Sequence, residues 1–152
     1  MTHLLLDPSC SGSGMLLGKI DALIPQNTNI EARHAELASF QLKCIEHAFT
    51  CTSGLSFQPS RSTECRIVTN AQRVVYSTCS IDALENEEVV LRALKANPAW
   101  EIVPIMPQWK RRGTGDNAKK EVAKCVRVLP EDGASGFFVA LFQRKSIKKK
   151  SK

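Results

Sequence analysis

Two short apolar segments, each followed by a turn that carries a cysteine, constrain the fold of this chain more than any other feature. His3–Leu6 is an apolar run that stops at Asp7-Pro8, and residues 73–77 form a second run that stops at Thr78-Cys79-Ser80. Runs without polar alternation are typical of strands covered on both faces of an α/β sheet. Residues 31–51, between the runs, have an apolar stripe at helical spacing, so we expect two parallel neighbouring strands joined by a helix. The stripe consists of Ala38, Leu42, Ile45 and Phe49, widened by Leu37, Cys44 and Ala48.

The rest of the chain predicts a sheet that is parallel at its start and antiparallel at its end. A helix is expected over about residues 84–96, where Glu85, Glu87 and Glu88 suit the positive N-terminal end. This order of elements indicates the α/β fold class. The other expected segments are coil with at most one helical turn over 15–30, a flexible insertion over 52–65, a strand over 100–103, a polar loop over 104–121, and a terminal hairpin of strands over 125–129 and 137–142.

The composition is that of a globular domain with a basic end. Hydrophobic residues make up 43% of the 152 residues and charged residues 24%, which excludes wholesale disorder. Five of the lysines behind the net charge of +6 lie in residues 145–152, where there is no acid. We expect a solvated tail that binds polyanions weakly or acts as a nuclear or nucleolar address. No apolar run approaches the roughly 18 residues of a membrane helix.

The six cysteines include two at informative positions. None forms a C-x-x-C pair, so the spacing fits neither a zinc site nor a disulfide scaffold, and a reducing compartment is expected. Cys10 and Cys79 follow the two parallel strands, so both thiols should lie at one sheet edge, each before a helix whose N-terminus favours the thiolate. Covalent catalysis, a redox disulfide between the two, and two small buried residues are all compatible with this placement.

Small residues follow Cys10 and favour a ligand-binding turn. The segment Cys-Ser-Gly-Ser-Gly at 10–14 allows a sharp turn and a close approach of a ligand to the backbone. Asp7 could bind an amino group of a ligand or base, or could simply form a turn before proline. Gly12, Gly14 and Gly18 read G-x-G-x-x-x-G, one residue too long for the dinucleotide fingerprint. Dinucleotide binding is therefore disfavoured.

Together these motifs resemble a known family of enzymes. The segment Asp-Pro-Ser-Cys-Ser-Gly-Ser-Gly at 7–14, Val-Tyr-Ser-Thr-Cys-Ser at 75–80 and Glu-Asn-Glu at 85–87 resemble RNA cytosine-5 methyltransferases of the RsmB/Nop (Nop/Sun) family. The first motif is most similar to the eukaryotic branch that modifies large-subunit ribosomal RNA, and Gly-Phe-Phe-Val-Ala at 136–140 is similar to the family's closing strand. The resemblance implies a Rossmann-like S-adenosylmethionine methyltransferase fold, with residues 1–144 as part of the catalytic domain. From its charge, the segment 145–152 is expected to be a lysine-rich disordered tail.

The resemblance also implies roles for single residues. In this family the cysteine of Thr-Cys-Ser, here Cys79, is the nucleophile that adds to C6 of cytosine. The cysteine of Pro-Ser-Cys, here Cys10, assists product release, and the aspartate before the proline, here Asp7, contacts S-adenosylmethionine. The implied substrate is RNA, ribosomal RNA above all, with an accessible target base, and the implied location is the nucleus or nucleolus.

The sequence departs from the family's pattern at its start. Only six residues precede Asp7, whereas the family's glycine-rich cofactor loop and its acidic ribose contact lie upstream of that aspartate. We therefore expect the C-terminal half of a catalytic domain, or alternatively a non-catalytic remnant that binds RNA. Lys110, Arg111 and Arg112, beside Trp109, are the candidate RNA contacts within the folded part. No metal site is expected, because His34 and His47 are not at ligand spacing.

Overall fold

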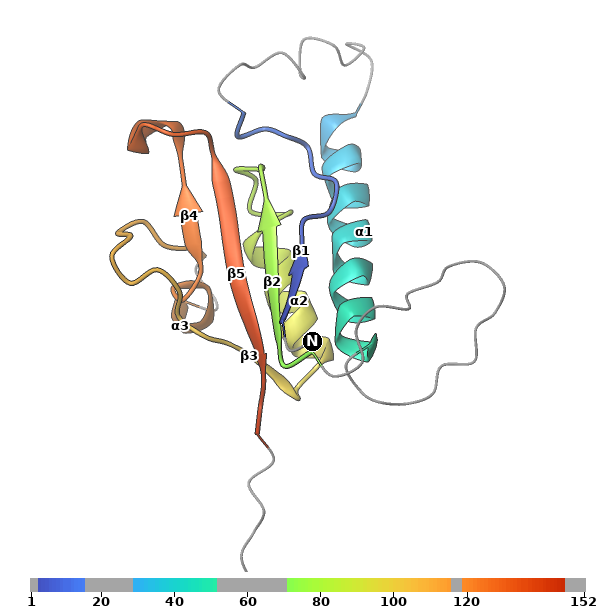
Figure 1. Cartoon of the computed structure of the whole chain (residues 1–152). Coiled ribbons are helices and arrows are strands. Elements are labelled where there is room, and N and C mark those ends of the chain that lie inside the picture. Colours follow the sequence, from blue (N-terminus) through green and yellow to red (C-terminus); the bar gives the residue numbers. More distant parts are fainter. Residues whose placement is uncertain (1–2, 16–28, 52–70, 116–118, 147–152) are drawn as a thin grey trace, which may run out of the picture.

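A computed structural model describes residues 3–15, 29–51, 71–115 and 119–146 (Figure 1). Parallel and antiparallel strands form one mixed sheet, so the α/β class predicted from the sequence is confirmed. The elements are β1 (His3–Leu6), α1 (Ile30–Cys51), β2 (Arg73–Thr78), α2 (Glu87–Ala96), β3 (Trp100–Ile102), α3 (Lys119–Val122), β4 (Val126–Val128), a 3-10 turn (Pro130–Asp132) and β5 (Phe137–Arg144).

The sheet has the predicted change of strand direction. Its order is β1-β2-β5-β3, with β4 also paired to β5. β1 and β2 are parallel, with His3 opposite Arg73, whereas β5 is antiparallel to β2 and to both β3 and β4. The parallel start and the antiparallel ending are therefore confirmed. As a result, the residues that follow β1 and β2 leave the sheet at the same edge.

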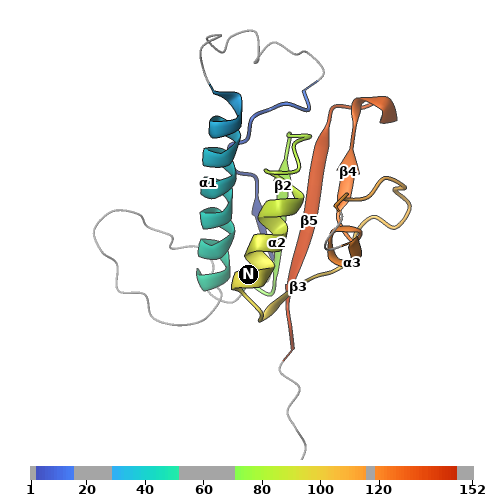
Figure 2. The ribbon, with the colours of Figure 1, turned by 180° about the vertical axis from the view of Figure 1, so that it is seen from behind.

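Helices α1 and α2 lie on the same side of the sheet (Figures 1 and 2). They enclose a core in which the rings of Phe49 and Trp100 stack 4.2 Å apart and Phe142 meets Phe49 edge-on at 5.1 Å. The stripe predicted on α1 is the buried face, because Ala38, Ile45 and Phe49 are almost inaccessible to solvent. This aromatic packing anchors the end of α1 to the sheet. No helix among the described residues is long and apolar enough to cross a membrane.

Several element boundaries differ from the predicted ones because side chains bind backbone groups there. The helix expected from about Leu84 begins at Glu87, since an Asp82 turn and contacts of Asn86 hold the preceding residues in another conformation. The short helix α3 lies at the end of the segment expected to be a loop over 104–121. β5 extends to Arg144, two residues beyond the prediction, where it pairs with β2 and β3.

The start of the predicted tail is tied to the folded part of the chain. The Lys145 amide donates to the Ala99 carbonyl at 2.9 Å, and its ammonium group donates to the Pro98 carbonyl. Residues 147–152, like most of the predicted coil over 15–30 and the predicted insertion over 52–65, lie outside the described residues. The division into a domain over 1–144 and a disordered tail over 145–152 stays a prediction.

Candidate active site

Cys10 and Cys79 are in direct contact at the rim of the sheet. Their Sγ atoms are 2.9 Å apart, and both side chains are half-buried. Cys79 immediately follows β2, and Cys10 lies four residues past the end of β1. The expectation that parallel strands bring both thiols to one edge is thus confirmed, although 69 residues separate them in sequence. A ligand at this rim would meet both sulfur atoms at once.

The surroundings of the Cys10 thiol disfavour its charged form. Burial and, after it, the hydrogen bond with Cys79 raise the pKa of the Cys10 thiol to about 12. Cys10 therefore keeps its proton near neutral pH and is the natural donor to the sulfur of Cys79. The prediction that a following helix N-terminus favours the thiolate was wrong for Cys10, because desolvation by burial dominates and raises its pKa.

This protonation state predicts slow alkylation of Cys10. Iodoacetamide reacts with the thiolate, so the Cys10 rate should climb tenfold for each pH unit up to about pH 11, whereas free glutathione levels off once the pH passes its ordinary thiol pKa near 8.5. The measurement is peptide-level mass spectrometry of Cys10 labelling against pH. A plateau below about pH 9 would show that Cys10 is an ordinary thiol, contrary to this assignment.

Asp7 lies at the same rim, at the carboxyl end of β1. Its side chain is exposed, and its Oδ1 accepts a hydrogen bond from the Ser77 hydroxyl of β2 at 2.9 Å. Ser77 precedes Cys79 by two residues, so Asp7 is tied to the strand that carries the second thiol. The acidic side chain is thereby held at the carboxyl end of β1 while it stays open to solvent.

Close backbone packing joins three segments behind the thiols. The Gly14 amide donates to the Cys79 carbonyl at 2.9 Å, and the Gly14 carbonyl accepts from the Gly136 amide at 2.6 Å. A Cβ atom on Gly14 would lie 2.5 Å from the Gly136 oxygen and 2.8 Å from the Cys79 oxygen. Glycine is thus required here by space, because any larger residue would push the Cys10 and Cys79 turns apart.

Sequence reasoning missed the polar groups beneath the two turns. Glu85 and Gln41 are completely buried, and the Gln41 amide donates to Glu85 Oε2 at 2.8 Å. The Tyr76 hydroxyl donates to the backbone carbonyl of Glu85 at 2.6 Å. One sequence signal was available for Gln41, which follows Ala38 by three residues and precedes Ile45 by four, and therefore faces the core. Glu85 was interpreted as an acid at a helix start and as part of the Glu-Asn-Glu motif, without a structural role.

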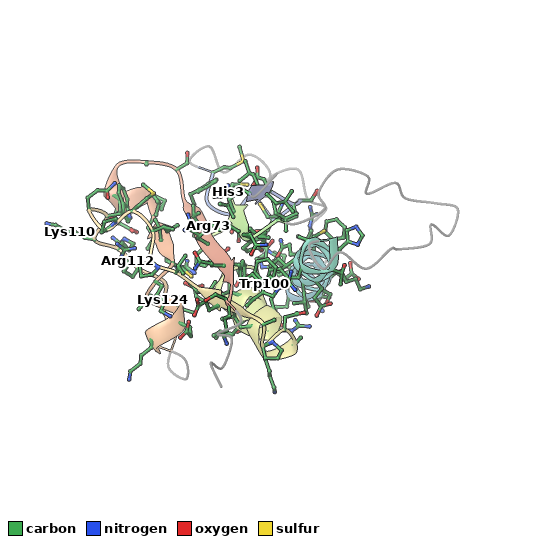
Figure 3. All side chains as sticks on the ribbon, turned by 60° about the horizontal axis from the view of Figure 1, so that its bottom comes forward. His3, Arg73, Trp100, Lys110, Arg112 and Lys124 are labelled. Atoms are coloured by element: carbon green, nitrogen blue, oxygen red, sulfur yellow. The ribbon has the colours of Figure 1, made fainter. Side chains whose placement is uncertain are left out.

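The predicted RNA contacts mostly have partners within the chain. Arg111 forms a two-pronged pair with Asp132, which holds the pKa of that carboxyl below its usual range. Arg112 donates to two backbone carbonyls of the same loop, those of Ile105 and Met106. Lys110 is exposed and points outward at the edge of the molecule, with Arg112 turned inward (Figure 3). Trp109 donates its indole N–H to the Arg127 carbonyl, which fits an anchoring role.

A possible set of metal ligands meets below the Cys79 turn. His34, Asp82 and Glu85 bring one ligand atom each within 4.8 Å of one another. His34 is bonded to Asp82, as expected for a satisfied histidine. Both Glu85 oxygens already accept hydrogen bonds from Ser11, Gln41 and Ser80. These contacts account for the cluster without an ion, and the sequence-based view that the chain has no metal site stays a prediction.

Known proteins resemble the chain over nearly its whole length. The family described as 16S rRNA methyltransferase RsmB/F matches residues 1–143. A 25S rRNA (cytosine-C(5))-methyltransferase, NSUN5 of Arabidopsis thaliana, is 39% identical over 149 residues, which cover 93% of this chain and 23% of that protein. A 28S rRNA (cytosine-C(5))-methyltransferase of Mus musculus is 36% identical over 95% of this chain and 27% of that protein. The chain thus spans about a quarter of the length of these relatives.

Solved structures agree with the fold. A methyltransferase homologue from Pyrococcus horikoshii matches with a TM-score of 0.61 at 24% identity, over 95% of this chain and 39% of that one. NSun6 from the same organism, crystallised with SFG, matches with a TM-score of 0.58 at 21% identity, over 92% of this chain and 29% of that one. The expected Rossmann-like methyltransferase fold and the resemblance to the eukaryotic large-subunit branch are confirmed. The chain belongs to the RsmB/F family of ribosomal RNA methyltransferases.

Proposed function

We propose that this chain carries the two-cysteine part of a catalytic domain that methylates C5 of cytosine in RNA, with large-subunit ribosomal RNA as the substrate. The observation that carries the proposal is the 2.9 Å contact between Cys10 and Cys79 at the sheet edge where such folds bind ligands. Family membership and relatives that act on 25S and 28S rRNA support this choice of reaction and substrate. The nucleus or nucleolus is the corresponding location.

In this reaction Cys79 is the nucleophile. C5 of cytosine is a poor nucleophile until a thiolate adds its electron pair at C6, which places the electrons of the C5–C6 double bond at C5. C5 can then form a bond to an incoming methyl group. The protonated Cys10 thiol stabilises the attacking form of Cys79 by donating a hydrogen bond to its sulfur.

Cys10 then assists release. Once Cys79 is bonded to carbon it no longer holds a negative charge beside Cys10, so one of the causes that raise the Cys10 pKa is removed. Cys10 can then give up its own proton to solvent and, as the thiolate, take the proton from C5. The electrons of that C–H bond rebuild the C5–C6 double bond, and the C6–S bond breaks to regenerate the Cys79 thiolate.

The methyl donor we propose is S-adenosylmethionine, which supplies an electrophilic methyl group when it is bound. Of the residues present, Asp7 fits this ligand best, because its carboxyl group is exposed at the end of β1 and is held there by Ser77. The neighbour crystallised with SFG supports a small-molecule site in this fold. Lys110, Arg111 and Arg112 remain the proposed RNA contacts, with Lys110 the most available of the three.

The test replaces the matching segment of the Arabidopsis relative with this chain and measures methyl transfer to cytosine in large-subunit rRNA. In this chimera, Cys10→Ala should lower turnover by about 10²-fold, because proton removal is slowed, while a covalent RNA–protein adduct accumulates. Denaturing gel electrophoresis detects the adduct. If the Cys10→Ala chimera released product cleanly, Cys10 would have no role in release.

A thiol redox protein is a second candidate, favoured by the same sulfur contact. It predicts that Cys10 and Cys79 cycle between thiols and a disulfide with no dependence on RNA. An intact chimera that transfers no methyl group, but whose disulfide is reversibly reduced during an oxidoreductase assay, would favour this alternative. A chimera that binds rRNA with neither activity would favour the RNA-binding remnant.

A further inference from the structure

Glu85 has a buried carboxylate that the reaction scheme leaves without a role. It lies two residues before α2, it is completely inaccessible to solvent, and no arginine or lysine among the described residues pairs with it. Burying a carboxylate is costly unless hydrogen-bond donors surround it. Its donors therefore indicate what the residue does.

Two of these donors come from the residues that directly follow the two cysteines. The backbone N–H of Ser11, next to Cys10, donates to Glu85 Oε2 at 2.9 Å, and the hydroxyl of Ser80, next to Cys79, donates to Oε1 at 2.9 Å. The carboxylate thus holds one turn with each of its oxygens. Hydrogen bonds to an ionised acceptor are about twice as strong as neutral ones.

The other contacts fix Glu85 itself. Gln41 of α1 donates to Oε2 at 2.8 Å and also to the Ser9 carbonyl at 3.0 Å, so the helix supports both the carboxylate and the Cys10 turn. The Tyr76 hydroxyl holds the Glu85 backbone. Glu85 is therefore fixed in place by contacts from α1 and β2, in addition to its contacts with the two turns.

We propose that Glu85 is a positioning residue that holds the Cys10 and Cys79 turns together so that the two thiols stay in contact. The catalytic purpose of this contact rests on the proposed function, whereas the contact itself is a property of the folded chain. Glu85 does not touch the reacting atoms. It acts through Ser11 and Ser80, and its removal separates the sulfur atoms without changing either thiol chemically.

The geometry predicts a graded series of variants. In Glu85→Gln one amide oxygen can still accept the N–H groups of Ser11 and Gln41, but the NH₂ group then faces the Ser80 hydroxyl, which already accepts from the Asp82 amide. The tie to the Cys79 turn is weakened while that to the Cys10 turn is kept. Glu85→Ala removes both ties. Ser80→Ala removes the second, together with the contacts of the Ser80 hydroxyl with Ser11 and Ser13 on the Cys10 turn.

The test measures how readily Cys10 and Cys79 form a disulfide in the chain, in a buffer of oxidised and reduced dithiothreitol. The two thiols lose two electrons and two protons to oxidised dithiothreitol, and peptide mass spectrometry quantifies the 10–79 linkage. The equilibrium constant should fall about tenfold or more in Glu85→Ala, and less in Glu85→Gln and Ser80→Ala. Glu88→Gln, an exposed carboxylate in the first turn of α2, is the matched control and should equal the wild type.

The outcomes separate positioning from a general loss of stability. If Glu85→Ala fails to fold, the comparison of Glu85→Gln and Ser80→Ala with Glu88→Gln still tests whether Glu85 holds the thiols together. Equal equilibrium constants in folded Glu85 variants and the wild type overturn the proposal, and so does a wild-type chain whose 10–79 linkage does not form. The assay contains neither RNA nor a methyl donor. Its result can therefore be interpreted even if the chimera does not methylate RNA. Conversely, if the chimera transfers methyl groups but the Glu85 variants form the 10–79 disulfide as readily as the wild type, only the positioning role of Glu85 is rejected.

Discussion

Replacing Cys79 with alanine in the chimera lowers methyl transfer by about 10⁴-fold or more, in line with the loss of a covalent nucleophile in other enzymes. Without the sulfur no electron pair is added to C6, and C5 stays too weak a nucleophile to accept a methyl group. Alanine fits the half-buried position, so the fold should be kept. Rates are measured as labelled methyl incorporated into rRNA under single-turnover conditions.

The matched control is Cys44→Ala. Cys44 is a half-buried free cysteine on α1 and is not among the residues placed at the rim. Its replacement should leave the rate within about twofold, because surface and partly buried changes away from a site have small effects. If Cys79→Ala still methylated RNA, another group would have to be the nucleophile, and the proposed mechanism would be wrong.

Gly14→Ala should have the largest effect on stability. The new methyl group would lie 2.5 Å from the Gly136 oxygen, 2.7 Å from the Gly136 carbonyl carbon and 2.8 Å from the Cys79 oxygen, all of them backbone atoms. Backbone in a paired region cannot yield as a flexible side chain can. Overpacking of this kind should lower the free energy of unfolding by about 3 kcal/mol, measured by urea denaturation.

Gly133→Ala provides the contrast. Gly133 has a φ of +79° and nothing within 4 Å of an added Cβ, so only the left-handed backbone is penalised, by about 1 kcal/mol. The two variants therefore separate lack of space from backbone strain. If Gly14→Ala were as stable as Gly133→Ala, the close packing of the Cys10 turn on Cys79 and Gly136 would be wrong.

The arrangement of strands and the meeting of the thiols could be predicted because each depends on a simple pattern. An apolar run ended by proline marked β1, β-branched residues marked β2, and the helical stripe ending at Phe49 required a crossover between them. Parallel strands then place their ends at one edge, whatever the details of the loops. The location of Cys10 and Cys79 followed from topology alone.

The groups that support the thiols could not be predicted, because their partners are brought together by the fold. Glu85 is one of three acids near a helix start, and only the structure shows that it is buried under Ser11 and Ser80 while Glu88 is exposed. Arg111 looked available for RNA until β5 and its preceding turn placed Asp132 beside it. Polarity can be read from a sequence, whereas the assignment of donors to acceptors requires the structure.

The most direct test of the central claim, that these two thiols work together on one cytosine, is to identify the trapped residue. An rRNA fragment with 5-fluorocytosine at the target position should stop the reaction after methyl transfer, because C5 then carries fluorine in place of the hydrogen that must leave as a proton. Digestion of the trapped chimera and mass spectrometry should then find the nucleotide on the peptide that contains Cys79. A nucleotide attached to Cys10 or to any other residue would contradict the account.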